Sequence, residues 1–124
     1  MGGRSGDLYR LGGRVLDAQT QRGLPQVRLR LQAKIPTALG ASALVTYGLT
    51  REDGTYELEL GAGFDLMRLA ERIRLDAGKP GYEPSGADIS PPTQKRASYT
   101  APDIILHARE AKPFHFPSES PETR

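Results

Sequence analysis

Residues 51–60 read REDGTYELEL, a charged turn that ends in glycine and opens onto a strictly alternating segment. An Asp-Gly pair between alternating apolar residues is a strong hairpin signal, because glycine readily takes the positive φ that such turns require. Along an extended strand, Tyr56, Leu58 and Leu60 lie on one face and polar residues lie on the other. The stretch therefore predicts a hairpin whose second strand has one dry and one solvated face.

Alternating segments recur on both sides of this turn. The most regular is residues 26–33, where Val27, Leu29, Leu31 and Ala33 alternate with polar side chains and are expected in the core. In a strand near residues 44–50, Val45, Tyr47 and Leu49 share one face, whereas residues 34–42 and 61–63 are expected to be loops. Further strands are expected near residues 8–17, 73–77, 87–90 and 103–108, and a short helix within residues 64–72.

Length and composition indicate one small domain built from strands. The chain has 124 residues, of which 37% are hydrophobic, and this suffices for one modest core. Ten prolines and fourteen glycines are too many for a helical bundle of this size and suit short strands joined by turns. The sequence therefore predicts an all-β fold, a Greek-key β-sandwich of about seven strands with one short helix before the fifth.

The sandwich is expected to span residues 8–110, after a flexible N-terminus at residues 1–7. Residues 111–124 are rich in Pro, Ser and Glu, show no period, and are expected to be a disordered tail unless something holds them. Two exposed phenylalanines flank a histidine there, and burying both rings would contribute about 3–5 kcal/mol before ordering costs. Two hypotheses stay open: this tail packs on another subunit, or it folds back on its own sandwich. The three residues are Phe114, His115 and Phe116.

Three sequence blocks in a fixed order resemble a known family. Residues 13–18 with 24–29 give a Gly-x-Val-x-Asp pattern followed by Leu-Pro and a second strand, residues 50–56 are similar to a Thr-Asp-x-x-Gly-x-Tyr/Phe hairpin, and residues 79–84 give a Gly-Tyr turn. In these blocks the chain resembles the carboxypeptidase regulatory-like domain, a transthyretin-like (prealbumin-like) β-sandwich. Gln26 departs from the family's usual glycine, and residues 64–72 look like an insertion. The resemblance implies an accessory or interaction module without catalysis.

The residues that enzymes need are sparse. The chain has no cysteine, so a disulfide, a thiolate metal site and a thiol nucleophile are all excluded. The related hydroxyisourate hydrolase has a catalytic histidine before its Val-Leu-Asp run, where this chain has Arg14, and the chain also lacks that enzyme's C-terminal sequence. His107 is expected to be a half-exposed sheet residue, and His115 lies in the tail. No catalytic residue, metal or cofactor is expected.

Charge and hydropathy also limit the partners. Seventeen basic and fifteen acidic side chains are mixed along the chain and leave a net charge of +2, which does not favour nucleic-acid binding. No apolar run approaches membrane-spanning length, so direct membrane insertion is not expected. The residues leave the compartment open, with the cytoplasm as the default because no signal peptide is evident, while the family resemblance also allows the cell envelope. Other protein subunits are the expected partners.

Four arginines are candidates for partner contact alongside the tail residues. Arg10, Arg14, Arg28 and Arg30 could form one basic patch, or they could be solvated strand exteriors partly neutralised by acidic neighbours. The resemblance places the first two strands in different sheets and favours the second interpretation. The main hypothesis is a non-catalytic structural or protein-binding subunit of a larger complex. The alternative is a small-ligand or carbohydrate-binding accessory domain, although the chain has no tryptophan to stack on sugars.

Overall fold

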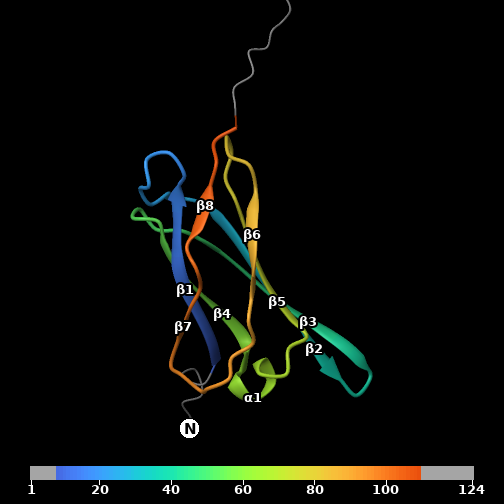
Figure 1. The fold of residues 1–124 in the computed structure, drawn as a ribbon. Helices are drawn as coiled ribbons and strands as arrows, with labels where there is room; N and C mark the ends of the chain where they lie inside the picture. Colours follow the sequence, from blue (N-terminus) through green and yellow to red (C-terminus); the bar gives the residue numbers. More distant parts are fainter. Residues whose placement is uncertain (1–7, 110–124) are drawn as a thin grey trace, which may run out of the picture.

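In the computed structural model, which describes residues 8–109, two four-stranded sheets face each other across one core (Figure 1). One sheet has the order β4-β1-β7, with β8 also paired to β1, and the other has the order β3-β2-β5-β6. The all-β sandwich is therefore confirmed, with eight strands in place of about seven. The elements are β1 (Leu8–Asp17), β2 (Arg28–Thr37), β3 (Gly40–Leu49), β4 (Thr55–Gly63), α1 (Phe64–Met67), β5 (Arg72–Gly78), β6 (Ser85–Ile89), β7 (Tyr99–Thr100) and β8 (Ile104–Leu106).

Alternation along the strands fills the core as the sequence predicts. Buried side chains alternate with more exposed ones along β4, β5 and most of β1 and β2, because successive residues of a strand point to opposite faces. At about 25 cal/mol per Å² of apolar area, this burial is the main stabilising contribution to the fold. The predicted core residues Val27, Leu29, Leu31, Ala33, Tyr56, Leu58 and Leu60 are all buried.

Strand β1 joins segments that are far apart in the sequence. It pairs antiparallel with β4 along one edge and parallel with β7 and β8 along the other. Strand β2 lies in the opposite sheet, between β3 and β5. The first two strands therefore occupy different sheets, as the family resemblance implied.

The turn at residues 51–54 is confirmed, but the predicted hairpin is wrong. The Gly54 N–H donates to the Arg51 carbonyl oxygen at 2.9 Å, and Gly54 has a φ of 85°. The two strands that this turn connects do not pair: β3 pairs with β2, and β4 pairs with β1. The turn instead carries the chain from one sheet to the other, a choice that depends on distant strands and not on the turn's own sequence.

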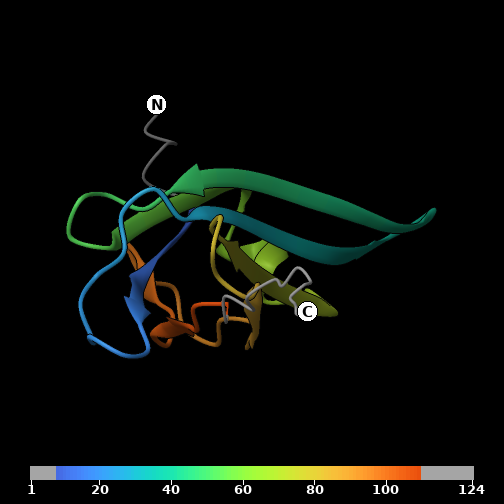
Figure 2. The same cartoon turned by 90° about the horizontal axis from the view of Figure 1, so that it is seen from above.

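The predicted loop at residues 34–42 is a hairpin. Strand β2 continues through buried Ile35 to Thr37, and β3 begins at Gly40 after a two-residue connection. Pro36 is tolerated because β5 begins opposite Lys34, so no strand of the described residues requires a donor from residue 36 on that side. The hairpin consequently extends beyond the rest of the molecule, as the view from above shows (Figure 2).

Smaller predictions have mixed outcomes. Residues 61–63 belong to β4 and are not a loop. The short helix expected within residues 64–72 is confirmed as α1, which has four residues; beyond it, the Glu71 N–H donates to the Lys34 carbonyl oxygen of β2. Strand β7 was not predicted, since two residues give no alternation; it is marked by Tyr99, whose ring stacks on Tyr9 with centroids 5.0 Å apart.

Candidate functional site

The outer face of the β3-β2-β5-β6 sheet carries exposed apolar side chains along its edge strand β3. Residues directly opposite each other in antiparallel strands share a face, and the register pairs Arg28 with Leu49 and Arg30 with Tyr47. Because both arginines are exposed, their β3 partners also face solvent. We call Val45, Tyr47 and Leu49 the β3 apolar column; they are 40%, 71% and 52% exposed.

The inner face of β3 explains why its large side chains lie outside. Gly48 faces β4, and a Cβ at this position would lie 2.5 Å from Leu58 Cδ2. Leu58 is buried, so the space beneath β3 is already filled from the opposite sheet. Strand β3 therefore has the reverse of the usual pattern, with glycine at a core-facing position and tyrosine in water.

Charged side chains cover the remainder of this outer face. Arg30 lies 3.9 Å from Asp76, and Arg74 bridges Asp76 and Asp88 at 3.0 and 3.5 Å. Such exposed pairs contribute about 0–1 kcal/mol each and leave the surface well hydrated. Among the described residues Arg28 makes no ion pair, and it lies directly opposite Leu49 at one end of the column.

The other two candidate arginines lie on the opposite sheet and already have partners. Arg10 donates to Glu59 at 2.9 Å, and Arg14 donates to both carboxylate oxygens of Asp103, at 3.3 and 2.7 Å. The four arginines therefore form two separate pairs and not one basic patch. The partner role of Arg10 and Arg14 stays a prediction, as does that of Phe114, His115 and Phe116, which lie outside the described residues.

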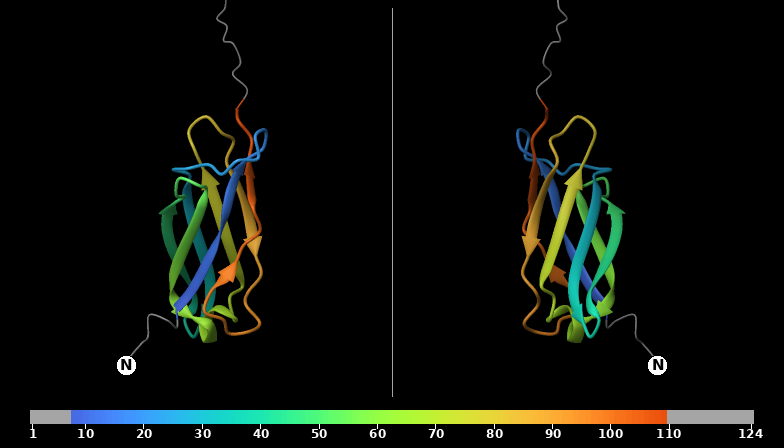
Figure 3. Two further views of the ribbon diagram at one scale, coloured as in Figure 1. Left: turned by 90° about the vertical axis from the view of Figure 1, so that its left-hand side faces the viewer. Right: turned by 90° about the vertical axis from the view of Figure 1, so that its right-hand side faces the viewer.

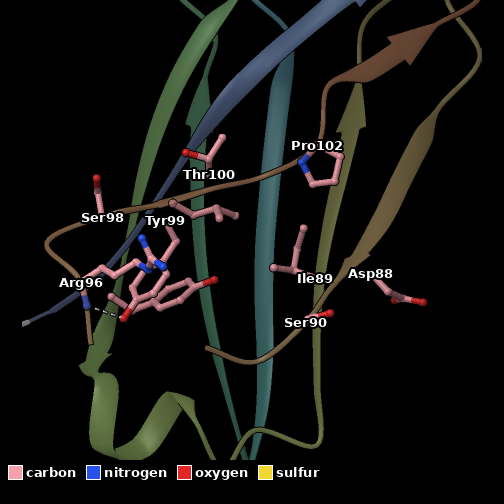
Figure 4. A pocket seen from close by; sticks show the side chains of 10 residues that line it. Asp88, Ile89, Ser90, Arg96, Ser98, Tyr99, Thr100 and Pro102 are labelled. Atoms are coloured by element: carbon pink, nitrogen blue, oxygen red, sulfur yellow. Dashed lines mark hydrogen bonds between the residues drawn. The ribbon is translucent and has the colours of Figure 1, made fainter. Parts of the chain in front are cut away.

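A pocket of about 460 Å³ opens between β1, β6 and β7 (Figure 4). The Tyr99 hydroxyl there accepts the Arg96 backbone N–H at 3.0 Å and donates to the Gln94 carbonyl oxygen at 2.9 Å. Burial raises the pKa of neighbouring Tyr9 to about 12, so this phenol stays protonated at neutral pH. Other polar groups of the lining are also engaged: Asp88 pairs with Arg72 and Arg74, and the Arg96 side chain donates to Gln94.

No constellation for catalysis or metal binding emerges within residues 8–109. His107 is exposed at the end of β8, more open than the half-exposed position expected for it. In the same range, no three His, Cys, Asp or Glu side chains gather closely enough to hold a metal ion. Nor does any helix in this part of the chain have the length and apolar character needed to cross a membrane.

Sequence reasoning missed the β3 apolar column as a contact surface. It recognised that Val45, Tyr47 and Leu49 share a face but did not establish which face that is. A usable signal was present: residues 35–50 contain no charged side chain, although a quarter of the whole chain is charged. A long uncharged run that includes an edge strand is unusual for a surface left in water.

Comparisons with known proteins identify the fold and no family. No family model and no curated protein matches the chain. Among solved structures, it is similar to a 9R-lipoxygenase from Cyanothece PCC8801, with 15% identity, a TM-score of 0.57, and coverage of 98% of this chain and 21% of that one. It is also similar to the shaft pilin SpaA from Lactobacillus rhamnosus GG, with 14% identity, a TM-score of 0.53, and coverage of 86% and 48%. The chain thus spans a fifth to a half of these proteins and shares a β-sandwich fold with a domain of each.

Proposed function

We propose that this chain is a non-catalytic structural module that binds another protein subunit through the outer face and open edge of β3. The observation that supports this most strongly is the β3 apolar column, which places a tyrosine, a leucine and a valine side by side in water. Contiguous exposed apolar side chains on a soluble domain commonly mark a protein interface. Arg28, next to Leu49, supplies a polar rim to the same surface.

A comparison with the other edge strands, β4 and β6, also supports β3 as the binding edge. Strand β4, at the edge of the opposite sheet, exposes Glu57 and Glu59, while β6 exposes Asp88 and is flanked by Pro84 and Pro91. Charges and prolines of this kind discourage an edge from pairing with another chain. Strand β3 has neither along its ten residues, so its edge is suited to being covered.

The comparisons fit a structural role without naming a partner. One similar structure is a shaft pilin, and the resemblance to the carboxypeptidase regulatory-like domain implies an accessory or interaction module. The alternative, a small-ligand or carbohydrate-binding domain, would use the pocket beside Tyr99. That alternative has less support, because the Tyr99 hydroxyl is already bonded within its own loop.

The proposal is tested by placing a charge in the β3 apolar column and identifying which proteins no longer co-purify with the chain. The full chain, Tyr47→Lys and the matched control Leu66→Lys would each be purified with an affinity tag from the native cells. Leu66 is also an exposed apolar residue, 51% accessible, but it lies on α1 outside the column. We expect a protein that co-purifies with the unchanged chain and with Leu66→Lys to be lost with Tyr47→Lys. The same set of proteins on all three baits would contradict the proposal.

A further inference from the structure

When two copies of β3 are aligned antiparallel, large side chains of one copy lie beside small side chains of the other. We propose that the occupant of this edge is a second copy of the chain, whose β3 pairs antiparallel with the first β3 about a two-fold axis at Thr46. This inference rests on the proposed function and names the partner for the same surface. The pairing would join two four-stranded sheets into one continuous sheet of eight strands.

Backbone groups are available for this pairing. In an antiparallel sheet, alternate residues direct their N–H and C=O groups toward one neighbour or the other. The Thr50 N–H donates to the Val27 carbonyl oxygen, so residue 50 faces β2 and residues 49, 47, 45 and 43 direct their groups to the open edge. A two-fold axis at Thr46 sets Val45 opposite Tyr47 of the other copy. Both residues direct their backbone N–H and C=O groups to the open edge, so the two can exchange hydrogen bonds.

Side chains are complementary in the same register. On the outer face, Tyr47 meets Val45 of the second copy, an aromatic and β-branched pair of the kind that stabilises sheets. Leu49 meets Ala43, so a large side chain again lies beside a small one. On the inner face, Leu44 meets Gly48 and Thr46 meets itself. Each contact occurs twice, as a two-fold interface requires.

Charge favours a second copy over a strongly basic partner. Residues 35–50 bring no charge to the interface, so pairing two copies creates no direct repulsion. The cations of β2 that lie beside β3 are Arg28, Arg30 and Lys34, and three strand spacings would separate the two β2 strands. That is about 14 Å at 4.8 Å per spacing, beyond the screening length of about 8 Å at physiological salt.

The edge is also accessible. Strand β3 lies at one margin of the sandwich in both views of Figure 3, and no strand formed by residues 8–109 lies beyond it. Its ten residues span about 34 Å at 3.4 Å per residue, long enough for eight or so main-chain bonds across the axis.

The absence of cysteine allows a test at single-residue resolution. In the proposed register the two Thr46 residues form a non-hydrogen-bonded pair with Cα atoms about 4.5 Å apart, inside the disulfide range of about 4.4–6.8 Å. Two copies of Ser42, four residues away on the same side of β3, would be about 27 Å apart, eight residues at 3.4 Å each. Ser42→Cys is therefore the matched control for Thr46→Cys in the full chain.

We expect the unchanged chain to show a concentration-dependent dimer by sedimentation velocity. With oxidised glutathione as oxidant, Thr46→Cys should form a covalent dimer at least tenfold faster than Ser42→Cys, and Tyr47→Lys should be monomeric while Leu66→Lys still dimerises. A chain that stays monomeric at every concentration, or equal cross-linking of the two cysteine variants, would overturn the inference. If the chain is a monomer but a different protein co-purifies with it and is lost with Tyr47→Lys, only the identification of a second copy as the partner is overturned. If the chain is a monomer and Tyr47→Lys loses no co-purifying protein, the proposed function is overturned too.

Discussion

Strands β3 and β4 follow each other in the chain and each closes one edge of a sheet, yet they distribute their side chains in opposite ways. Strand β4 buries Tyr56 and Leu58 and exposes glutamates between them. Strand β3 exposes Tyr47 and Leu49 and turns Thr46, Gly48 and a partly buried Leu44 toward the core. The two strands are ten and nine residues long, so length does not account for the difference.

The difference shows that two edge strands of one domain can differ both in how much they contribute to the core and in whether charged side chains protect their edge. Strand β4 supplies the core and protects its own edge with charge, as isolated edges require. Strand β3 contributes little to the core, because Leu58 from β4 already fills the space under Gly48. Tyr47 and Leu49 can therefore form a contact surface without loss of packing in the core.

The largest expected effect comes from truncating a leucine on each strand. Leu58→Ala should lower the free energy of unfolding by about 2–5 kcal/mol, because it leaves a cavity between the sheets. Leu49→Ala, at a residue 52% exposed, should cost less than about 1 kcal/mol in the monomer. Urea denaturation at a concentration low enough to exclude association would measure both. Equal losses would show that β3 packs into the core as β4 does.

A smaller effect is expected where the two strands touch. Gly48→Ala places a Cβ against Leu58 Cδ2 and should destabilise the fold by about 1–3 kcal/mol, as overpacking does. Gly61→Ala on β4 is the matched control, since a Cβ there meets nothing within 4 Å, and it should be neutral or stabilising by up to about 1 kcal/mol. Thermal unfolding of both variants gives the comparison. A neutral Gly48→Ala would mean that β3 does not lie tightly over β4.

The smallest effect concerns the turn that joins the strands. Hydrogen bonds from the Thr55 hydroxyl and backbone N–H lower the pKa of Asp53. A carboxyl whose folded-state pKa is depressed contributes stability that is present above its unfolded pKa of about 3.9 and is lost as the pH falls through its folded pKa. Asp53→Asn should therefore flatten the pH dependence of the melting temperature below about pH 4 relative to the unchanged chain. An unaltered profile would show that Asp53 does not hold the turn.

Local patterns in the sequence predicted much of the fold. Strand β1 begins and ends where expected, at Leu8 and Asp17, and the buried side of β2 is the predicted one. These features depend on neighbouring residues alone, since alternation and turn residues act over a few positions. The resemblance to transthyretin-like sandwiches added the assignment of the first two strands to different sheets.

The remaining features depend on contacts that no local pattern encodes. The turn before β4 has the chemistry of a hairpin, but it crosses between sheets because β1 offers β4 a partner. The face on which Tyr47 lies follows from its pairing with Arg30, and β7 is held by pairing with β1 and by the stacking of Tyr99 on Tyr9. The candidate arginines were correctly placed on strand exteriors, yet the apolar column beside two of them was missed for the same reason.

Site-resolved amide hydrogen exchange, measured on the full chain at increasing protein concentration, tests the docking role of β3 most directly. If two copies pair along this edge, exchange at Val45 and Tyr47 should slow as the concentration rises, because their N–H groups become hydrogen-bonded. Exchange at Glu57 and Glu59, on the charged edge of β4, should stay constant. Concentration-independent exchange at Val45 and Tyr47, or equal slowing on β4, would contradict the pairing of β3 with its copy.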